Sequence, residues 1–350
     1  MFISRIRETV GIDIGSSSVK VVQVKEQKGV YTLLSVGILP LPAEAIVDNT
    51  LMDSSSIVET IKTLVKDLDI SAKDAASSIS GNAVIIRKIV LPSMDQEELE
   101  EKILWEAEQY IPFDINDVNI DFQILGQDAG DPSRMNVLLV ASKKDIVNDY
   151  IAVFNETGLK LSVIDVDAFA VQNAFEINYD VFPEEVIALV NIGASIMNLN
   201  IVKDGSSIFT RDVQTGGSLY TDEIQKQFGV SSEEAERIKI SGDCPDRLKL
   251  QEIISRLNET LALEMRRSLD FYNSTASEGK ISKVMLSGGA AKTPMLTEAV
   301  SQRLGVPVEI LNSFQKVKFS DKEFDANYLG EIAPLVTVAM GLATRRLGDK

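Results

Sequence analysis

The chain has 350 residues, and its 52 acidic and 35 basic side chains give a formal net charge of -17. A chain of this length exceeds the size at which a single hydrophobic core usually stops growing, so we expect two lobes. The acidic balance argues against binding to nucleic acid or to anionic lipid, because both require basic side chains.

Two residue types narrow the possible chemistry. The sequence contains no histidine, which excludes Ser-His-Asp catalysis and leaves carboxylates, lysines, hydroxyls and backbone amides with a hard cation such as Mg²⁺. The single cysteine, Cys244, excludes an internal disulfide. No apolar run approaches the roughly 18 to 20 residues that span a bilayer, and residues 1–9 lack the apolar region of a signal peptide, so we expect a cytoplasmic protein.

The first predicted element is a β-hairpin over residues 10–24 (VGIDIGSSSVKVVQV), in which the tight turn at Gly15 exposes backbone N–H groups that could surround a phosphate. Residues 31–39 continue the sheet as a third strand. Apolar residues at helical spacing predict a helix over residues 54–68.

Residues 86–165 predict a small α/β unit. Ser93 and Gln96 indicate a capping box before a helix that Pro112 ends, and strands over residues 118–124 and 136–141 precede a helix closed by Gly158. Trp105 lies off the apolar stripe of the first of these helices. It therefore either packs beneath the sheet of this unit or lies on a contact surface.

The second lobe begins with a second predicted hairpin, at residues 190–205 (VNIGASIMNLNIVKDG), in which an apolar strand, a glycine turn and another apolar strand follow in the same order as in the first. A glycine pair in residues 212–218 (DVQTGGS) precedes helical segments over residues 220–271. Residues 283–305 then predict a strand, the Gly288-Gly289 turn, and a helix that begins near Pro294 and ends at Gly305. Residues 329–347 predict a terminal helix.

The order of hairpin, hairpin and strand-Gly-Gly-helix resembles the actin-like ATPase superfamily, with its phosphate-1, phosphate-2 and adenosine motifs. This resemblance implies an α/β, two-lobed, RNase H-like fold with an inserted subdomain of the type called 1C in FtsA. The implied division is 1–85 and 166–189 for the core of lobe I, 86–165 for the inserted subdomain, 190–217 and 280–327 for the core of lobe II, 218–279 for subdomain 2B, and 328–350 for a helix that returns to lobe I.

The resemblance also implies a site for ATP and Mg²⁺ between the lobes. Asp13 would hold the metal, and Gly15, Ser16, Ser17, Ser18 and Lys20 would contact the phosphates. Asn191 and Gly193 form the second phosphate turn, Gly216 and Gly217 approach the ribose and phosphates, Glu236 and Lys239 lie beside the purine, and Gly288 and Gly289 form the adenosine turn.

Hydrolysis is expected to be slow at most, because Asn191 replaces an aspartate of the broader superfamily and an amide cannot act as a base. Asp167 is the remaining carboxylate near the expected γ-phosphate. It would either orient the attacking water or serve as a helix N-cap before Ala168.

Residues 91–121 and 164–174, with the ending VTVAMGLATRRLGDK, resemble the PilM family of type IV pilus assembly, related to FtsA. The resemblance implies a cytoplasmic scaffold for twitching motility that reaches the inner membrane through protein partners. It would capture the cytoplasmic N-terminal segment of PilN in a groove between lobe I and the inserted unit, contact other assembly components, and self-associate. The alternatives are an FtsA-like filament-forming division protein and a small-metabolite kinase on the same fold.

Overall fold

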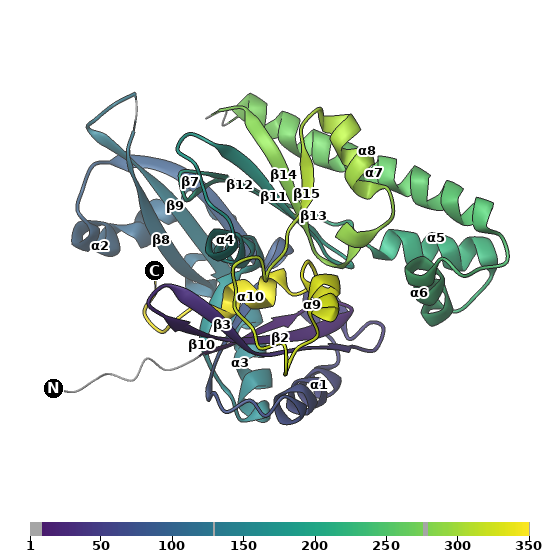
Figure 1. Ribbon diagram of the computed structural model, residues 1–350. Coiled ribbons are helices and arrows are strands. Elements are labelled where there is room, and N and C mark those ends of the chain that lie inside the picture. Colours follow the sequence, from purple (N-terminus) through teal and green to yellow (C-terminus); the bar gives the residue numbers. More distant parts are fainter. Residues whose placement is uncertain (1–8, 129, 276–278, 350) are drawn as a thin grey trace.

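Two five-stranded sheets with the same topology form the centre of the computed structural model, which describes residues 9–128, 130–275 and 279–349 (Figure 1). The first sheet, in the order β10-β6-β1-β2-β3, contains β1 (Thr9–Ile14), β2 (Ser18–Gln27), β3 (Val30–Pro40), β6 (Asp74–Ile79) and β10 (Lys160–Val166). The second, in the order β13-β12-β11-β14-β15, contains β11 (Val186–Ile192), β12 (Met197–Lys203), β13 (Ser206–Val213), β14 (Ile281–Ser287) and β15 (Val308–Ile310).

Both sheets are wound in the same way. In each, the first strand pairs antiparallel with the second and parallel with the fourth, so β1 and β11 occupy equivalent central places. All seven residues of β11 are buried, as a central strand covered on both faces requires. The two-lobed actin-like arrangement expected from the repeated hairpin is therefore confirmed.

Two helices cover the outer face of the first sheet. α1 (Ser54–Asp67) begins after Asp53, whose carboxylate accepts a hydrogen bond from the Ser56 N–H. α3 (Lys144–Thr157) ends at Gly158, which adopts φ 79°, and buries Phe154 against the first sheet's core. A two-stranded ribbon, β4 (Ile46–Val47) and β5 (Thr50–Leu51), lies between β3 and α1.

A separate three-stranded sheet, in the order β7-β9-β8, contains β7 (Val84–Pro92), β8 (Val118–Gln127) and β9 (Arg134–Lys143). α2 (Gln96–Ala107) covers one face of it, and two short 3₁₀ turns, η1 (Gly81–Ala83) and η2 (Ile115–Asp117), precede β7 and β8. α3 and β10, although within the expected range 86–165, pack with the first sheet. We therefore propose 84–143 as the extent of the inserted subdomain.

The start of α2 differs from the expected capping box. Asp95, not Ser93, caps the helix, and its carboxylate accepts a hydrogen bond from the Glu98 N–H. A carboxylate at this position also interacts favourably with the helix dipole, which explains the preference for Asp95. The Trp105 side chain is 68% exposed, so it does not pack beneath the sheet.

The second lobe carries an arm of helices, α5 (Ser218–Phe228), α6 (Ser232–Ser241) and α7 (Arg247–Thr275), which extends away from the second sheet in Figure 1. After β14, a 3₁₀ turn η3 (Gly289–Lys292) leads to α8 (Leu296–Leu304). α8 begins two residues after Pro294 and ends, as expected, at Gly305 in the left-handed region. Residues 1–8 and 276–278 and Lys350, which belong to the expected ranges of lobe I, subdomain 2B and the terminal helix, lie outside the described residues.

The single terminal helix expected over residues 329–347 is instead two, α9 (Ala326–Ile332) and α10 (Thr337–Ala343), bent by 102° around a break that contains Pro334. In the part of the chain that the structure describes, no single helix is long and apolar enough to cross a membrane. α9 and α10 reach that length and composition only when the two helices are counted as one segment. Its apolar side chains, such as Leu329 and Met340, are buried in the core of the first lobe.

α10 and α4 (Asp167–Asn178) form the layer between the two sheets (Figure 1). Two glycines allow the close approach. A Cβ on Gly341 of α10 would lie 1.7 Å from the Ala170 carbonyl oxygen of α4, and a Cβ on Gly11 of β1 would lie 2.2 Å from the Ala339 carbonyl oxygen. Close backbone contacts thus hold α10 against α4 and β1, and side chains of this layer, such as Val171 and Val338, pack against the second sheet.

We predict that Gly341→Ala destabilises the fold, because the added methyl meets a backbone carbonyl that cannot move without shifting α4. Overpacking of this kind typically costs about 1 to 3 kcal/mol of unfolding free energy, and sometimes more. Gly330→Ala is the matched control, since it also lies in a helix but its Cβ would meet no atom within 4 Å. Chemical denaturation of both variants is the test, and equal stabilities would contradict the interlobe packing described above.

Candidate functional site

The first hairpin places a carboxylate and an ammonium side by side. Asp13 and Lys20 are direct partners in the register of β1 and β2, and their charged groups lie 3.1 Å apart. The Gly15 N–H donates to the Ser18 carbonyl at 3.1 Å, and a Cβ on Gly15 would lie 2.8 Å from Lys20 Nζ. The turn over Ser16 and Ser17 therefore stays narrow and free of large side chains.

The second hairpin repeats this geometry with neutral groups. Asn191 and Asn198 occupy the register positions equivalent to Asp13 and Lys20, and Asn191 Nδ2 donates to Asn198 Oδ1 at 3.1 Å. Ser287 Oγ on the neighbouring strand donates to Asn191 Oδ1 at 3.2 Å. The Gly193 N–H donates to the Ile196 carbonyl at 2.9 Å, as Gly15 does in the first turn. An ionic pair in one lobe thus corresponds to an amide pair in the other.

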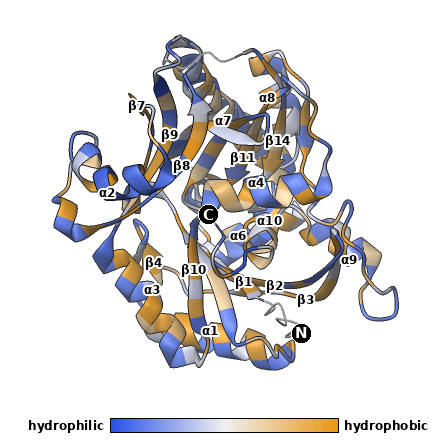
Figure 2. Ribbon diagram, turned by 90° about the vertical axis from the view of Figure 1, so that its left-hand side faces the viewer, coloured by the Kyte–Doolittle hydropathy of each residue, from blue (hydrophilic) through white to orange (hydrophobic). Residues whose placement is uncertain are grey.

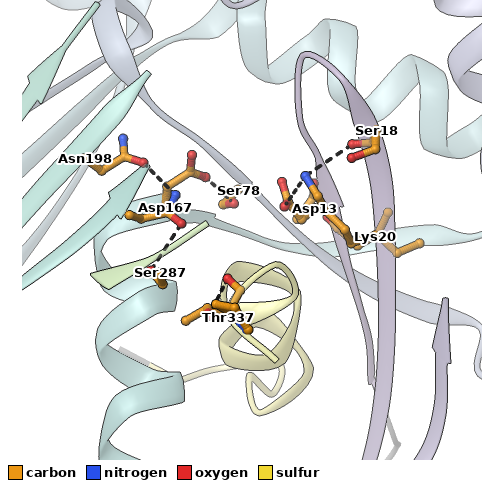
Figure 3. Close-up of polar contacts among 12 residues, drawn as sticks. Asp13, Ser18, Lys20, Ser78, Asp167, Asn198, Ser287 and Thr337 are labelled. Atoms are coloured by element: carbon orange, nitrogen blue, oxygen red, sulfur yellow. Dashed lines mark hydrogen bonds and ion pairs between the residues drawn. The ribbon is translucent and has the colours of Figure 1, made fainter. Parts of the chain in front are cut away.

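The tips of the two hairpins meet. The hydroxyl oxygens of Ser16 and Ser195 lie 2.9 Å apart, within hydrogen-bonding distance, although 179 positions separate them in the sequence. In Figure 3, Asp13, Ser18 and Lys20 lie on one side and Asn198 and Ser287 on the other, with Ser78 between them. The two turns that the sequence predicted to bind phosphate therefore face the same space.

Asp167 is the first residue of α4, and its carboxylate accepts a hydrogen bond from Ser78 Oγ at 2.6 Å (Figure 3). It does not cap the helix, because Val166 is the N-cap residue and makes no side-chain bond there. Burial, followed by the negative charge of Asp13, raises the pKa of Asp167 to about 7, although the hydroxyls of Ser78 and Ser80 oppose the shift. A carboxyl group that titrates near neutral pH can take up or release a proton.

Gly216 and Gly217 pack against the turn of the second hairpin. The Gly217 N–H donates to the Gly193 carbonyl at 2.8 Å, and a Cβ on Gly216 would lie 2.5 Å from the same oxygen. Lys239 Nζ approaches this segment, bound to Glu236 at 2.6 Å, and Glu236 also accepts from the Thr221 hydroxyl at 2.6 Å. The structure thus places Lys239 beside Gly217 and holds Glu236 next to it through their ion pair.

The last predicted turn follows β14. Gly288 has φ 86°, and a Cβ there would lie 2.4 Å from the Ile192 carbonyl oxygen, so only glycine fits. Its N–H donates to the Pro334 carbonyl at 2.7 Å. A Cβ on Gly289 would meet no atom within 4 Å. Gly289 therefore presents backbone that a ligand can approach.

Sequence reasoning missed a carboxylate and two of its partners. Asp212 on β13 accepts hydrogen bonds from Asn198 Nδ2, at 2.8 Å, and from the Gly81 N–H, and burial raises the pKa of Asp212. One signal was present in the sequence, because Asn198 and Asn200 alternate with apolar residues in a strand that is otherwise apolar. Amides on one face of a buried strand indicate a hydrogen-bonded network.

We predict that Asp167 makes stability depend on pH. Because its pKa rises from 3.8 to about 7 on folding, its contribution is fully present below pH 4 and is lost as pH rises towards 7. The unfolding free energy lost between these pH values is at most about 4 kcal/mol, and the actual loss is smaller because the side chain is partly exposed to solvent. Denaturation of the wild type and Asp167→Asn between these pH values should show the wild type losing stability relative to the variant. A constant difference would contradict the raised pKa.

Comparison with solved structures supports the fold. A chain in a solved PilM-PilN type IV pilus biogenesis complex is 28% identical, with a TM-score of 0.87, and the match covers 98% of this chain and 99% of that one. Two solved proteins share the fold at lower identity. EutJ, an ethanolamine utilization protein of Carboxydothermus hydrogenoformans, is 17% identical with a TM-score of 0.59 (96% and 88% covered). MreB5 of Spiroplasma citri, solved with ADP, is 11% identical with a TM-score of 0.51 (96% and 94% covered).

A curated relative, the cell division protein FtsA of Bacillus subtilis, is 23% identical over 257 residues, which are 66% of this chain and 57% of FtsA. The chain thus spans little more than half the length of that relative. The family model described as type IV pilus assembly protein PilM matches residues 11–347, nearly the whole chain. With the repeated hairpins and the inserted sheet, this match shows that the chain belongs to the PilM family of type IV pilus assembly proteins.

Proposed function

We propose that this protein is an ATP-binding scaffold that captures the cytoplasmic N-terminal segment of PilN in a groove between the first lobe and the inserted sheet. The observation that carries the proposal is a cavity of about 570 Å³ between these two parts. The solved relative in a PilM-PilN complex, matched over nearly the whole of both chains, supports the choice of partner.

Two edge strands border the groove. β10 is at the edge of the first sheet and β8 at the edge of the inserted sheet. Every residue from 119 to 123 on β8 and from 161 to 166 on β10 lines the cavity. Consecutive residues line a cavity when the edge of a strand faces it, because a single face would contribute only alternate residues. Figure 2 views this side of the molecule, with β8 and β9 above β10.

The groove suits an extended peptide that carries both apolar and polar side chains. The strand edges provide main-chain donors and acceptors, and apolar side chains such as Val140, Ile151 and Phe169 line the cavity. Polar side chains also line it, and two of them, Asp165 and Arg345, form an ion pair with a separation of 3.0 Å. Burial raises the pKa of Asp165, and the Arg345 charge opposes this. A PilN segment bound here would hold the protein at the inner membrane.

The interlobe residues fit a nucleotide. Gly15, Gly216 and Gly288 keep three turns free of side chains, and Gly289 leaves backbone open beside them. In the described part of the chain, no three acidic or cysteine side chains gather to hold a metal ion by themselves. Mg²⁺ typically binds one or two carboxylates together with phosphate oxygens, and Asp13 could supply the carboxylate once Lys20 turns to the phosphates. The bound metal would neutralise phosphate charge.

The phosphates would lie between the Ser16 and Ser195 tips, whose direct contact would open to admit them. Lys20 would pair with phosphate, Gly216 and Gly217 would border the ribose with Glu236 and Lys239, and Gly288 and Gly289 would border the base. Asp167 would orient water or accept its proton. With an amide at Asn191 in place of a second carboxylate, turnover would be slow or absent, and nucleotide would serve mainly to favour one state of closure.

We predict that Ile151→Glu weakens binding of a synthetic PilN N-terminal peptide by at least about tenfold, because a charge enters an apolar wall of the groove. Ile151 is already 39% exposed, so folding should be little affected. Ile240→Glu is the control, since Ile240 is also an exposed helical isoleucine but lies on α6. Fluorescence anisotropy with a labelled peptide gives the affinities. Equal affinity of both variants would place the peptide site elsewhere.

We also predict that Asp13→Ala lowers ATP affinity in the presence of Mg²⁺ much more than in EDTA, because the proposed metal ligand is removed. Isothermal titration calorimetry of both proteins under both conditions measures the effect. Lys20→Ala is a useful companion, because it removes the other half of the ion pair and should weaken ATP binding with or without the metal. Unchanged affinity of Asp13→Ala with Mg²⁺ would exclude Asp13 from the site.

A further inference from the structure

Asp212 uses its two carboxylate oxygens to join the lobes. Oδ1 accepts from Asn198 Nδ2 at 2.8 Å within the second lobe, and Oδ2 accepts from the backbone N–H of Gly81, two residues after β6 of the first lobe ends. None of the sequence motifs includes this residue as a ligand. Its two bonds connect the second phosphate turn to a segment 131 positions away.

The carboxylate fixes the direction of a chain of hydrogen bonds. Because an ionised carboxylate only accepts, Asn198 must turn its NH₂ group towards Asp212, which leaves Asn198 Oδ1 to accept from Asn191 Nδ2. Asn191 then presents Oδ1 to the hydroxyl of Ser287. An amide could otherwise adopt either orientation, so the negative charge of Asp212 determines how Asn191 faces the second turn.

Gly81 occupies a crowded position between the lobes. It has φ 65°, and a Cβ there would lie 2.0 Å from Asn49 Nδ2 and 3.1 Å from Ile196 Cδ1, in the second hairpin. The segment Gly81–Ala83 leads directly into β7 of the inserted sheet, and Ile79 and Val84 on either side of it line the groove. The same carboxylate therefore holds the second hairpin and the segment that borders the groove.

We propose that Asp212 is a positioning residue for the nucleotide site: it orients Asn191 through Asn198 and fixes the second hairpin against Gly81 of the first lobe. The orienting role rests on the nucleotide site proposed above, whereas the link between the lobes does not. The proposal also predicts which substitutions are compatible with one another. In an Asn191→Asp variant, the new carboxylate would lie against Asn198 Oδ1, and the oxygens would repel each other. Rotating the Asn198 amide would relieve this repulsion but would bring Asn198 Oδ1 against the Asp212 carboxylate. Only a second change, Asp212→Asn, supplies a donor for the rotated amide.

The link between the lobes is tested without nucleotide by hydrogen-deuterium exchange on the full chain. Asp212→Ala removes the acceptors of both Asn198 and Gly81. We expect the amides of residues 81–83 and of the second hairpin to exchange at least about tenfold faster than in the wild type. Asp222→Ala is the control, because it removes the same carboxylate from an exposed position on α5. Exchange in Asp212→Ala no faster than in this control would overturn the proposal.

The orienting role is tested by a double-mutant cycle of ATP affinity and of unfolding free energy in four proteins: wild type, Asn191→Asp, Asp212→Asn and the double variant. We expect the double variant to bind ATP at least about fivefold more tightly than Asn191→Asp alone. Loss of structure would not produce this result, because a second damaging change would weaken binding further. Additive effects in both measurements would overturn the orienting role. If the wild type binds no ATP, the proposed nucleotide site fails, and the unfolding cycle and the exchange experiment still decide the role of Asp212.

Discussion

The packing of α4 and α10 between the two sheets is the interaction on which the relative placement of the lobes rests, because side chains of both helices, such as Val171 and Val338, share a core with the second sheet. The Gly341 backbone lies so close to the Ala170 carbonyl that no side chain fits between them, and Gly11 gives α10 the same close approach to β1. Close-packed interiors resist small displacements, so this layer is a firm support for both sheets. With the lobes so placed, the hydroxyls of Ser16 and Ser195 meet. The same layer makes α4 a shared wall, since Asp167 at its start belongs to the interlobe site and Phe169 and Gln172 line the groove.

The two hairpins share their geometry and differ in their chemistry. Equivalent register positions hold Asp13 with Lys20 in one lobe and Asn191 with Asn198 in the other. A buried carboxylate needs a cation or several donors, whereas paired amides satisfy each other. In the second lobe the negative charge lies two strands away from β11, at Asp212 on β13, where Asn198 and the Gly81 N–H both donate to it. This arrangement is the basis of our proposal that nucleotide serves mainly to favour one closure of the lobes.

Much of the fold could be predicted because its signals are local. The glycine turns, the apolar strands and the Gly158 and Gly305 helix ends depend on neighbouring residues, and the structure has them where expected. Contacts between distant residues could not be predicted in this way. The sequence alone does not show that α3 packs on the first sheet, that Pro334 divides the last helix into two, or that Asp212 meets Gly81. The sequence offered two residues suited to cap α2, Ser93 and Asp95, and the preference for the carboxylate of Asp95 became clear only from the structure.

The central claim is that two edge strands, one from each part of the first lobe, form a groove for an extended segment of PilN. Hydrogen-deuterium exchange of the full chain, with and without a saturating PilN N-terminal peptide, tests it most directly because free strand edges exchange rapidly and paired edges do not. We expect the peptide to protect the backbone amides within residues 119–123 and 161–166 that point away from β9 and β6, because the others already bond to those strands. Protection confined to other surfaces, such as α2 around the exposed Trp105, with both edge strands unchanged, would contradict it.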